Sequence, residues 1–264
     1  MTSPKVANPG SQVPAIVRAT LIIDALSDSV QPMGTSELAR LLHLPKSSVH
    51  LICSTMMDLG LLVRRGENRF GIGPHVLQWA ESFQASSDLV REFQQLISET
   101  AILSELALNL TVLMGSEVLY VGCRNGQRPL SVRFGVGVVL PAIFTATGKA
   151  MLSTKPFDEV IEYVGDTWPA LYTRRSIQTF DQLKAELEAT RARGYSIDDG
   201  KLREGVYCLA APIFDSSSAA AIAGIALGLL QSEVTAETEV HIASELINFA
   251  NTLSQRLGGR VPVA

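Results

Sequence analysis

The feature that most constrains the fold is Pro45, which separates two short segments of helical periodicity. Before it, residues 36–43 place three leucines on one side of a helix. After it, apolar residues repeat at the i, i+3, i+4 and i+7 spacing of a second helix: Val49, Ile52, Cys53 and Met56. Because proline ends one helix and fits the first turn of the next, the pattern predicts a helix-turn-helix.

The flanking residues extend this motif. A further amphipathic helix is predicted over Val13–Leu26, and Thr35 is suited to cap the helix that follows. Gly60 is placed to end the third helix in a left-handed conformation. Residues 61–72, with a turn at 65–68, then predict a β-hairpin with arginines at its tip. Residues 13–73 are therefore predicted to form a winged helix-turn-helix domain.

The polar face of the third helix and the hairpin predict a contact surface for double-stranded operator DNA. Short hydroxyl side chains and a lysine at a helix N-terminus approach phosphates closely, and His50 reaches base edges. The predicted DNA-binding residues are Thr35, Ser36, Lys46, Ser47, Ser48, His50, Leu51, Arg64, Arg65 and Arg69. Two alternatives remain open: a merely solvated helix surface, and a helix-turn-helix that makes only protein contacts.

The distribution of charge agrees with a localised nucleic-acid surface. The chain carries a net charge of -4 over its 264 residues, which argues against a protein that binds nucleic acid along its whole surface. Residues 1–73 hold seven Lys and Arg against five Asp and Glu, whereas the remainder holds 15 against 21. The predicted winged domain is thus the more basic part of an acidic protein.

The remaining residues predict a linker and a larger domain. A helix is expected over residues 74–87, followed by a domain over residues 88–264. In that domain, strands are predicted at 107–114, 118–123, 130–134, 195–197, 206–212 and 222–230. Helices are predicted at 147–153, 157–163, 180–193 and 236–257. This order indicates an α+β fold with a mostly antiparallel sheet.

Several classes of protein are disfavoured. The longest apolar run, Ala219–Leu230, has 12 residues, too few to cross a bilayer. Residues 1–12 read as a disordered tail without a secretory signal, so a cytoplasmic protein with no membrane partner is expected. Three separated cysteines suggest neither a disulfide framework nor a metal site. No cofactor, metal or catalytic residue is predicted.

The ordered combination of three segments resembles the isocitrate lyase regulator (IclR) family of bacterial transcription factors. The segments are TSELARLLHLPKSSVHLICSTMMDLGLL at 35–62, LPAIFTATGKAML at 140–152 and RARGYSIDDGKLREGVYCLAAPIFD at 191–215. The resemblance implies a linker helix that pairs protomers, homodimers that often form dimers of dimers, and a GAF-like effector-binding domain. Where the family commonly has an arginine after the histidine, this chain has Leu51, so a different base preference is expected.

The resemblance also implies a pocket for a small-molecule metabolite. Its matching residues are Leu140, Ala146, Thr147, Asp198, Cys208, Ala226 and Gly228. The family often has serines at the last two positions. Ala226 and Gly228 lack these hydroxyl donors, each worth about 1 kcal/mol of net hydrogen bonding, so a roomier and less polar pocket is expected. A repressor of a catabolic operon, answering to an organic acid or aldehyde, is the function that this implies.

Alternative interpretations of these residues remain. The sequence from Ala146 to Lys149 resembles a phosphate loop, but Ile143 and Ala150 stand where glycine and a hydroxyl residue are needed. It is therefore read as a strand-to-helix turn, with or without a carboxylate at the helix N-terminus. Asp198 fits a turn residue as well as a pocket residue. An enzyme acting on a small carbonyl or acid, through Cys208 or Asp198, is the alternative function.

Overall fold

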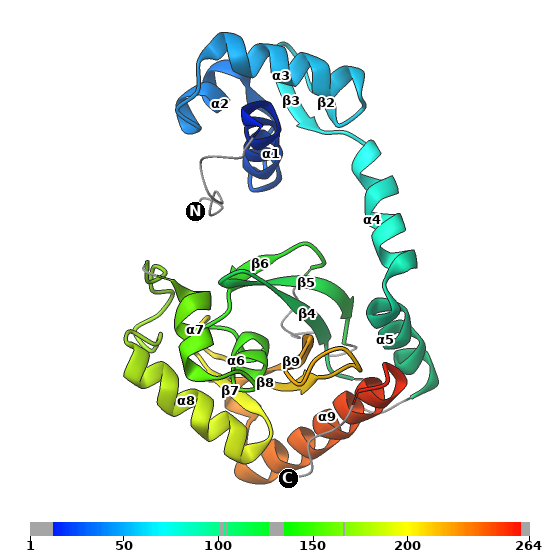
Figure 1. The fold of residues 1–264 in the computed structure, drawn as a ribbon, viewed down its shortest axis with the longest axis vertical. Coiled ribbons are helices and arrows are strands. Elements are labelled where there is room, and N and C mark those ends of the chain that lie inside the picture. The colour runs from blue at the N-terminus through cyan, green and yellow to red at the C-terminus, as the bar shows by residue number, and fades with distance from the viewer. Residues whose placement is uncertain (1–12, 101–102, 104, 127–134, 166, 260–264) are drawn as a thin grey trace. The chain divides into compact units, whose positions relative to one another are not determined.

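The computed structural model describes residues 13–100, 103, 105–126, 135–165 and 167–259. The chain divides into two compact units, Met1–Ser86 and Ser87–Ala264, and the first includes the predicted linker helix. The predicted tail, residues 1–12, and the predicted strand 130–134 lie outside the described residues. The expected two-domain α+β architecture is confirmed (Figure 1).

Within residues 13–86, the first unit contains three helices, a small sheet and a further helix (Figure 1). In chain order these are α1 (Pro14–Ser27), β1 (Met33–Gly34), α2 (Thr35–Leu41), α3 (Lys46–Asp58), β2 (Leu62–Arg64), β3 (Arg69–Ile72) and α4 (His75–Ser86). The strands are antiparallel in the order β1-β3-β2. The helix-turn-helix and the hairpin are present as predicted, and β1 adds a third strand to the hairpin.

Two helix starts differ from the prediction. Gly34, rather than Thr35, is the cap of α2, and the Glu37 carboxylate accepts a hydrogen bond from the Gly34 N–H at 2.8 Å. Pro45 is the cap of α3 rather than its first residue. Its fixed extended geometry still ends one helix and orients the next. Gly60 has a φ of 72°, the left-handed conformation expected at the end of α3.

The first unit has its own core, which sets the orientation of α3. The predicted apolar residues Val49, Cys53 and Met56 are buried among side chains from α1, α2 and the hairpin. Burial of this face leaves the opposite face of α3 on the surface. In contrast, α4 buries none of its residues in this chain, and Leu77, Trp79 and Phe83 are at least half exposed.

In the described part of the second unit, six strands form one antiparallel sheet in the order β6-β5-β4-β9-β8-β7. The strands are β4 (Leu108–Met114), β5 (Glu117–Arg124), β6 (Val139–Pro141), β7 (Ser196–Asp199), β8 (Val206–Ile213) and β9 (Ala223–Leu230). The helices are α5 (Asp88–Glu99), α6 (Ala146–Leu152), α7 (Phe157–Val164), α8 (Phe180–Arg193) and α9 (Ala236–Arg256), with a 3-10 turn at Gln231–Glu233. Except in the undescribed segment, the predicted strands and helices are found within a few residues.

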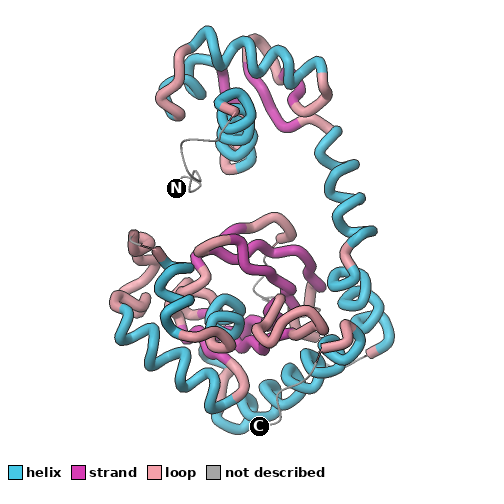
Figure 2. Tube along the Cα trace, viewed as in Figure 1, coloured by secondary structure: helices cyan, strands magenta, loops and turns pink. Residues whose placement is uncertain are grey.

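The helices lie on two faces of the sheet, as the tube in Figure 2 shows. Alternate residues of β8, such as Leu209 and Ala211, pack in the core that α5 and α9 cover. The intervening Cys208 and Ala210 face α6 instead, because successive side chains of a strand point to opposite faces. Helix α8 lies outside α6.

Small residues bring α6 close to the sheet. A Cβ added to Gly224 on β9 would lie 2.9 Å from the Cβ of Thr147 on α6, which is too short for two carbon atoms. The side chains opposite α6 on β8 and β9 are also small, including Ala210 and Ala226. This close approach places the first turn of α6 directly over the centre of the sheet.

Candidate functional site

Helix α3 carries five of the ten predicted DNA-binding residues. Lys46, Ser47 and His50 are exposed, and Leu51 is 68% exposed. Of these four, Lys46, Ser47 and His50 line a surface groove together with the start of α2 and the turn of the hairpin. The lining residues are Gly34, Thr35, Ser36, Glu37, Lys46, Ser47, His50, Glu67, Asn68 and Arg69. The groove therefore joins the two helices of the motif to the hairpin.

The accessibility of the predicted DNA-binding residues is not uniform. Ser36 is exposed and Ser48 is half-buried. Thr35 is only 8% exposed, the least accessible of the ten. A buried threonine in the first turn of α2 contributes to the wall of the groove more than to a flexible side-chain contact.

Arg69 has a role that the sequence did not reveal. Its guanidinium forms an ion pair with the Glu37 carboxylate at 3.0 Å and also donates to the Pro32 carbonyl oxygen. The Gly34 N–H holds the pKa of Glu37 below its usual value, and the charge of Arg69 acts in the same direction. Arg69 thus ties the hairpin to the start of α2, whereas Arg64 and Arg65 form no ion pair with a described residue.

A second candidate site lies between α6 and the sheet of the C-terminal unit. It is a cavity of about 20 Å³ lined by Asn109, Tyr120, Thr145, Ala146, Thr147, Asp198, Leu202, Cys208, Ala226 and Leu227. Five of the seven predicted pocket residues are brought together here. Leu140 is instead packed beside the α7 and α8 core, and the backbone of Gly228 pairs with Cys208 without lining the cavity.

Five lining residues were not predicted: Asn109, Tyr120, Thr145, Leu202 and Leu227. The sequence does hold a signal for Asn109: it is an amide within the otherwise mostly apolar strand Leu108–Met114. A buried amide needs hydrogen-bond partners, so such a residue indicates a polar site. Half of the ten lining residues are polar, and the space holds about one water molecule. That the pocket is roomier and less polar than in other members of the family stays a prediction.

The hydroxyls at the start of α6 differ in their partners. Thr145 caps the helix: its Oγ1 accepts from the Gly148 N–H at 3.0 Å and donates to the Ala142 carbonyl oxygen at 3.2 Å. This uses one of the amides that a carboxylate at the helix N-terminus would need. The Thr147 Oγ1 is buried and has no hydrogen-bond partner among the described residues. A buried hydroxyl without a partner costs about 1 to 3 kcal/mol.

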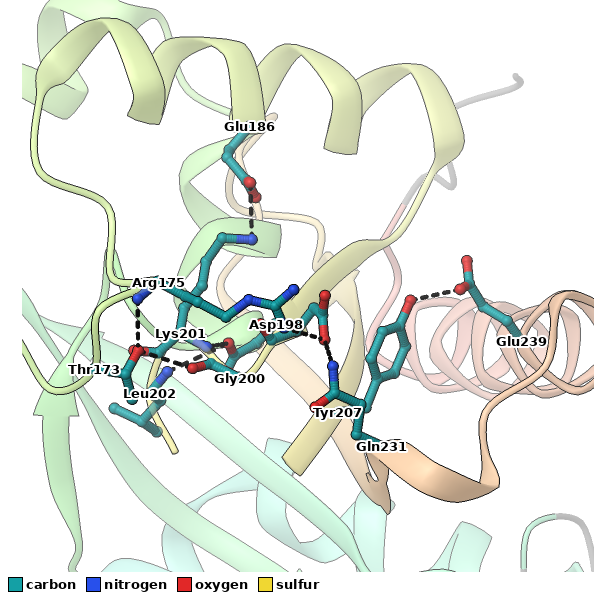
Figure 3. A network of polar contacts seen from close by, with 11 residues as sticks. Thr173, Arg175, Glu186, Asp198, Gly200, Lys201, Leu202, Tyr207, Gln231 and Glu239 are labelled. Atoms are coloured by element: carbon teal, nitrogen blue, oxygen red, sulfur yellow. Dashed lines mark hydrogen bonds and ion pairs between the residues drawn. The ribbon is translucent and has the colours of Figure 1, made fainter. Parts of the chain in front are cut away.

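Asp198 is both a turn residue and a residue of the cavity wall, the two alternatives that the sequence left open. Its carboxylate lines the cavity and also accepts hydrogen bonds from the backbone N–H of Lys201, at 2.8 Å, and of Leu202, at 3.4 Å. Figure 3 shows this turn, which the Thr173 hydroxyl also holds through the Gly200 carbonyl oxygen at 2.9 Å. Burial raises the pKa of Asp198, while the charge of Lys149 and the two N–H groups oppose the rise.

Cys208 is part of the cavity wall. Burial raises the pKa of its thiol far above the usual value, and the nearby Asp198 carboxylate acts in the same direction. A neutral thiol is a poor nucleophile.

Among the described residues, no cluster of three or more His, Cys, Asp or Glu side chains is arranged to hold a metal ion. No described helix combines the length and apolar character needed to span a membrane.

Comparisons with known proteins agree for both units. The IclR helix-turn-helix domain model matches residues 15–66, and the model described as bacterial transcriptional regulator IclR C-terminal matches residues 82–255. The crystal structure of the Agobacterium tumefaciens repressor BlcR is 43% identical, covers 95% of this chain and 99% of that chain, and superposes with a TM-score of 0.62.

Curated relatives extend the match. The transcriptional repressor IclR of Escherichia coli K12 is 26% identical, over 94% of this chain and 91% of the relative. The Pca regulon regulatory protein of Pseudomonas putida is 25% identical, over 82% and 78%. An IclR regulator structure from Alicyclobacillus acidocaldarius, at 19% identity and a TM-score of 0.82, supports the fold. The chain belongs to the IclR family of bacterial transcriptional regulators.

Proposed function

We propose that this regulator represses a catabolic operon by binding its operator through α3 and the hairpin, and that a small metabolite bound beneath α6 weakens that binding. The family makes the chain a regulator rather than an enzyme, which removes the alternative of catalysis through Cys208 or Asp198. Relatives named as repressors, including the acetate operon repressor of Salmonella typhimurium, support repression.

The DNA contacts divide into two kinds. In this proposal Ser47, His50 and Leu51 on α3 contact base edges, since the second helix of such a motif enters the major groove. Lys46, Arg64 and Arg65 supply charge for the phosphate backbone. Arg69, engaged with Glu37, acts by holding the hairpin in place.

The observation that supports the sensing function is the buried Thr147 hydroxyl at the cavity, which has no hydrogen-bond partner among the described residues. A carboxylate or carbonyl oxygen of a ligand would accept a hydrogen bond from this hydroxyl and remove the cost of leaving it unpaired. Because the cavity holds only about 20 Å³, an organic acid or aldehyde enters only if the turn that carries Leu202 moves outward. Ligand binding is thereby coupled to a conformational change.

Assembly as a homodimer through α4 completes the proposal. Its exposed side chains Trp79 and Phe83, four residues apart and therefore on one face of the helix, offer an apolar surface that a second copy would bury. A dimer binds two half-sites of an operator, and dimers of dimers would extend this arrangement. To move the assembly from 1:99 to 99:1 between two states, the metabolite must favour one state by about 5.5 kcal/mol.

Fluorescence anisotropy with DNA from the protein's own promoter region tests the proposal. We expect saturable binding that unrelated DNA does not match, and release on addition of one member of a panel of short organic acids and aldehydes. Lys46→Ala and Arg65→Ala should weaken binding, which separates a DNA surface from a motif used only for protein contacts. Failure to bind any DNA at low salt would refute the function.

A further inference from the structure

A second, larger hollow lies on the outer side of the C-terminal unit, between α8, the loop 174–178 and β7. Its volume is about 530 Å³, within the range of about 300 to 1,000 Å³ typical of small-molecule sites. It shares no lining residue with the cavity beneath α6. The charged or amide side chains that line it include Arg174, Arg175, Gln182, Glu186, Arg193 and Lys201. We call it the α8 groove.

The α8 groove carries an excess of positive charge on a protein whose net charge is -4. Four cationic side chains line it, against one carboxylate, that of Glu186. Arg175 is balanced from outside the lining by the Asp199 carboxylate, at 3.1 Å. Arg174 and Arg193 are exposed and form no ion pair with a described residue. Two cations of the groove therefore lack a counter-charge in the described part of the chain.

Glu186 cannot neutralise them, because it is already shared by two lysines. Its carboxylate contacts the ammonium of Lys149 at 3.1 Å and that of Lys201 at 2.9 Å. Lys149 is fully buried and also donates to the Ile197 carbonyl oxygen. A buried ammonium requires a carboxylate partner, so Glu186 is held in place from inside the protein. The remaining positive charge of the groove faces solvent.

The α8 groove is linked to the cavity beneath α6 by a single turn. The ammonium of Lys201 lies in the groove, while its backbone N–H donates to the Asp198 carboxylate in the cavity wall. The next residue, Leu202, lines the cavity. Figure 3 shows Asp198, Lys201 and Leu202 in this turn, with the Lys201 ammonium reaching Glu186 on α8. A ligand that drew Lys201 away from Glu186 would shift residues that shape the cavity.

We propose that the α8 groove binds a small polyanion, a metabolite bearing several phosphate or carboxylate oxygens, as a second ligand distinct from the effector beneath α6. The guanidinium groups of Arg174 and Arg193 supply paired N–H donors suited to such oxygens, and the Arg193 group lies over the Tyr195 ring, 5.5 Å from its centroid. Lys201, whose ammonium contacts Glu186, adds a third positive group to the lining. This site goes beyond the proposed function, because it requires neither DNA binding nor an occupied effector cavity.

Isothermal titration of the full chain with pyrophosphate and, separately, with citrate tests the site, at ionic strength held constant with sodium chloride. We expect one saturable site per chain for at least one of the two anions. Arg174→Gln and Arg193→Gln should each weaken it threefold or more, and the double variant at least tenfold. The matched control is Lys184→Gln, which removes the same charge from α8 outside the groove lining.

The outcomes distinguish specific binding in the α8 groove from non-specific electrostatic attraction of anions to the protein. If neither anion shows saturable binding, or if Lys184→Gln weakens binding as much as Arg174→Gln does, the proposal is wrong. Thr147→Val, which alters only the cavity beneath α6, should leave binding unchanged; loss of binding in this variant would place the anion in the cavity and overturn the proposal. Whichever anion saturates at lower concentration identifies a phosphate or a carboxylate ligand.

Discussion

The Thr147 hydroxyl allows a direct test of the sensing site. Thr147→Val keeps the shape of the side chain and removes a buried oxygen that has no partner among the described residues. An unsatisfied buried polar group costs about 1 to 3 kcal/mol, so we expect the ligand-free variant to gain about 1 kcal/mol in free energy of unfolding. For a domain of about 150 to 250 residues this raises Tm by about 2 to 4 °C.

Thr145 provides the matched control, two residues away in the same buried turn. Its hydroxyl is satisfied by the Gly148 N–H and the Ala142 carbonyl oxygen, so Thr145→Val removes a helix cap. The loss should cost about 1 kcal/mol. The two variants are thus expected to differ by about 2 kcal/mol, in opposite directions from the parent. The Thr111 hydroxyl is also buried without a partner among the described residues, but it lies on β4 outside the cavity lining. Thr111→Val should therefore gain stability as Thr147→Val does, without an effect on ligand binding.

Urea denaturation followed by circular dichroism measures these differences, and effector titration completes the test. Thr147→Val should weaken binding of the effector by about five- to tenfold, the equivalent of about 1 kcal/mol, whereas Thr111→Val should leave it unchanged. Destabilisation of Thr147→Val to the same extent as Thr145→Val would refute the reasoning, because the hydroxyl would then have a partner in the folded protein. Unchanged effector affinity in Thr147→Val would show that the Thr147 hydroxyl does not bind the ligand.

Three further predictions concern the DNA-binding unit. Arg65→Ala should lower the slope of log affinity against log salt by about 0.9 if the side chain neutralises one phosphate, as read from anisotropy titrations; an unchanged slope contradicts this contact. Leu51, exposed on α3, should contact a thymine methyl group: deoxyuridine in place of the contacted thymine should weaken binding of the parent but not of Leu51→Ala, and equal losses would exclude the contact. Because the pKa of Glu37 is lowered in the folded state, its tie to Arg69 is fully present above the unfolded pKa and is lost as the pH falls through the folded value; Glu37→Gln should therefore reduce the loss of stability on acidification, measured by urea titration between about pH 6 and pH 3.

Much of the architecture was predictable from local patterns. The periodicity of α3, the proline before it and Gly60 after it predict the helix-turn-helix without reference to any other part of the chain. The strand and helix segments of the second unit were also recognisable, since alternation with period two and period 3.6 is a property of neighbouring residues. Five of the seven pocket residues implied by the resemblance meet at one cavity.

The functional details depended on contacts between distant segments. Glu37 and Arg69, 32 residues apart, pair only because β3 lies beside β1. Asn109 enters the cavity because β4 lies next to β9 rather than because of its own neighbours in sequence.

The sequence by itself therefore determined which elements form and which faces are apolar, because those properties follow from the spacing of adjacent side chains. Only the tertiary structure decided which buried hydroxyls have no partner among the described residues and how small the cavity is. It also decided that one carboxylate, Glu186, serves two lysines. Hydrogen-bond satisfaction and the volume of a cavity are properties of the packed atoms that surround a group, and most of those atoms come from distant parts of the chain.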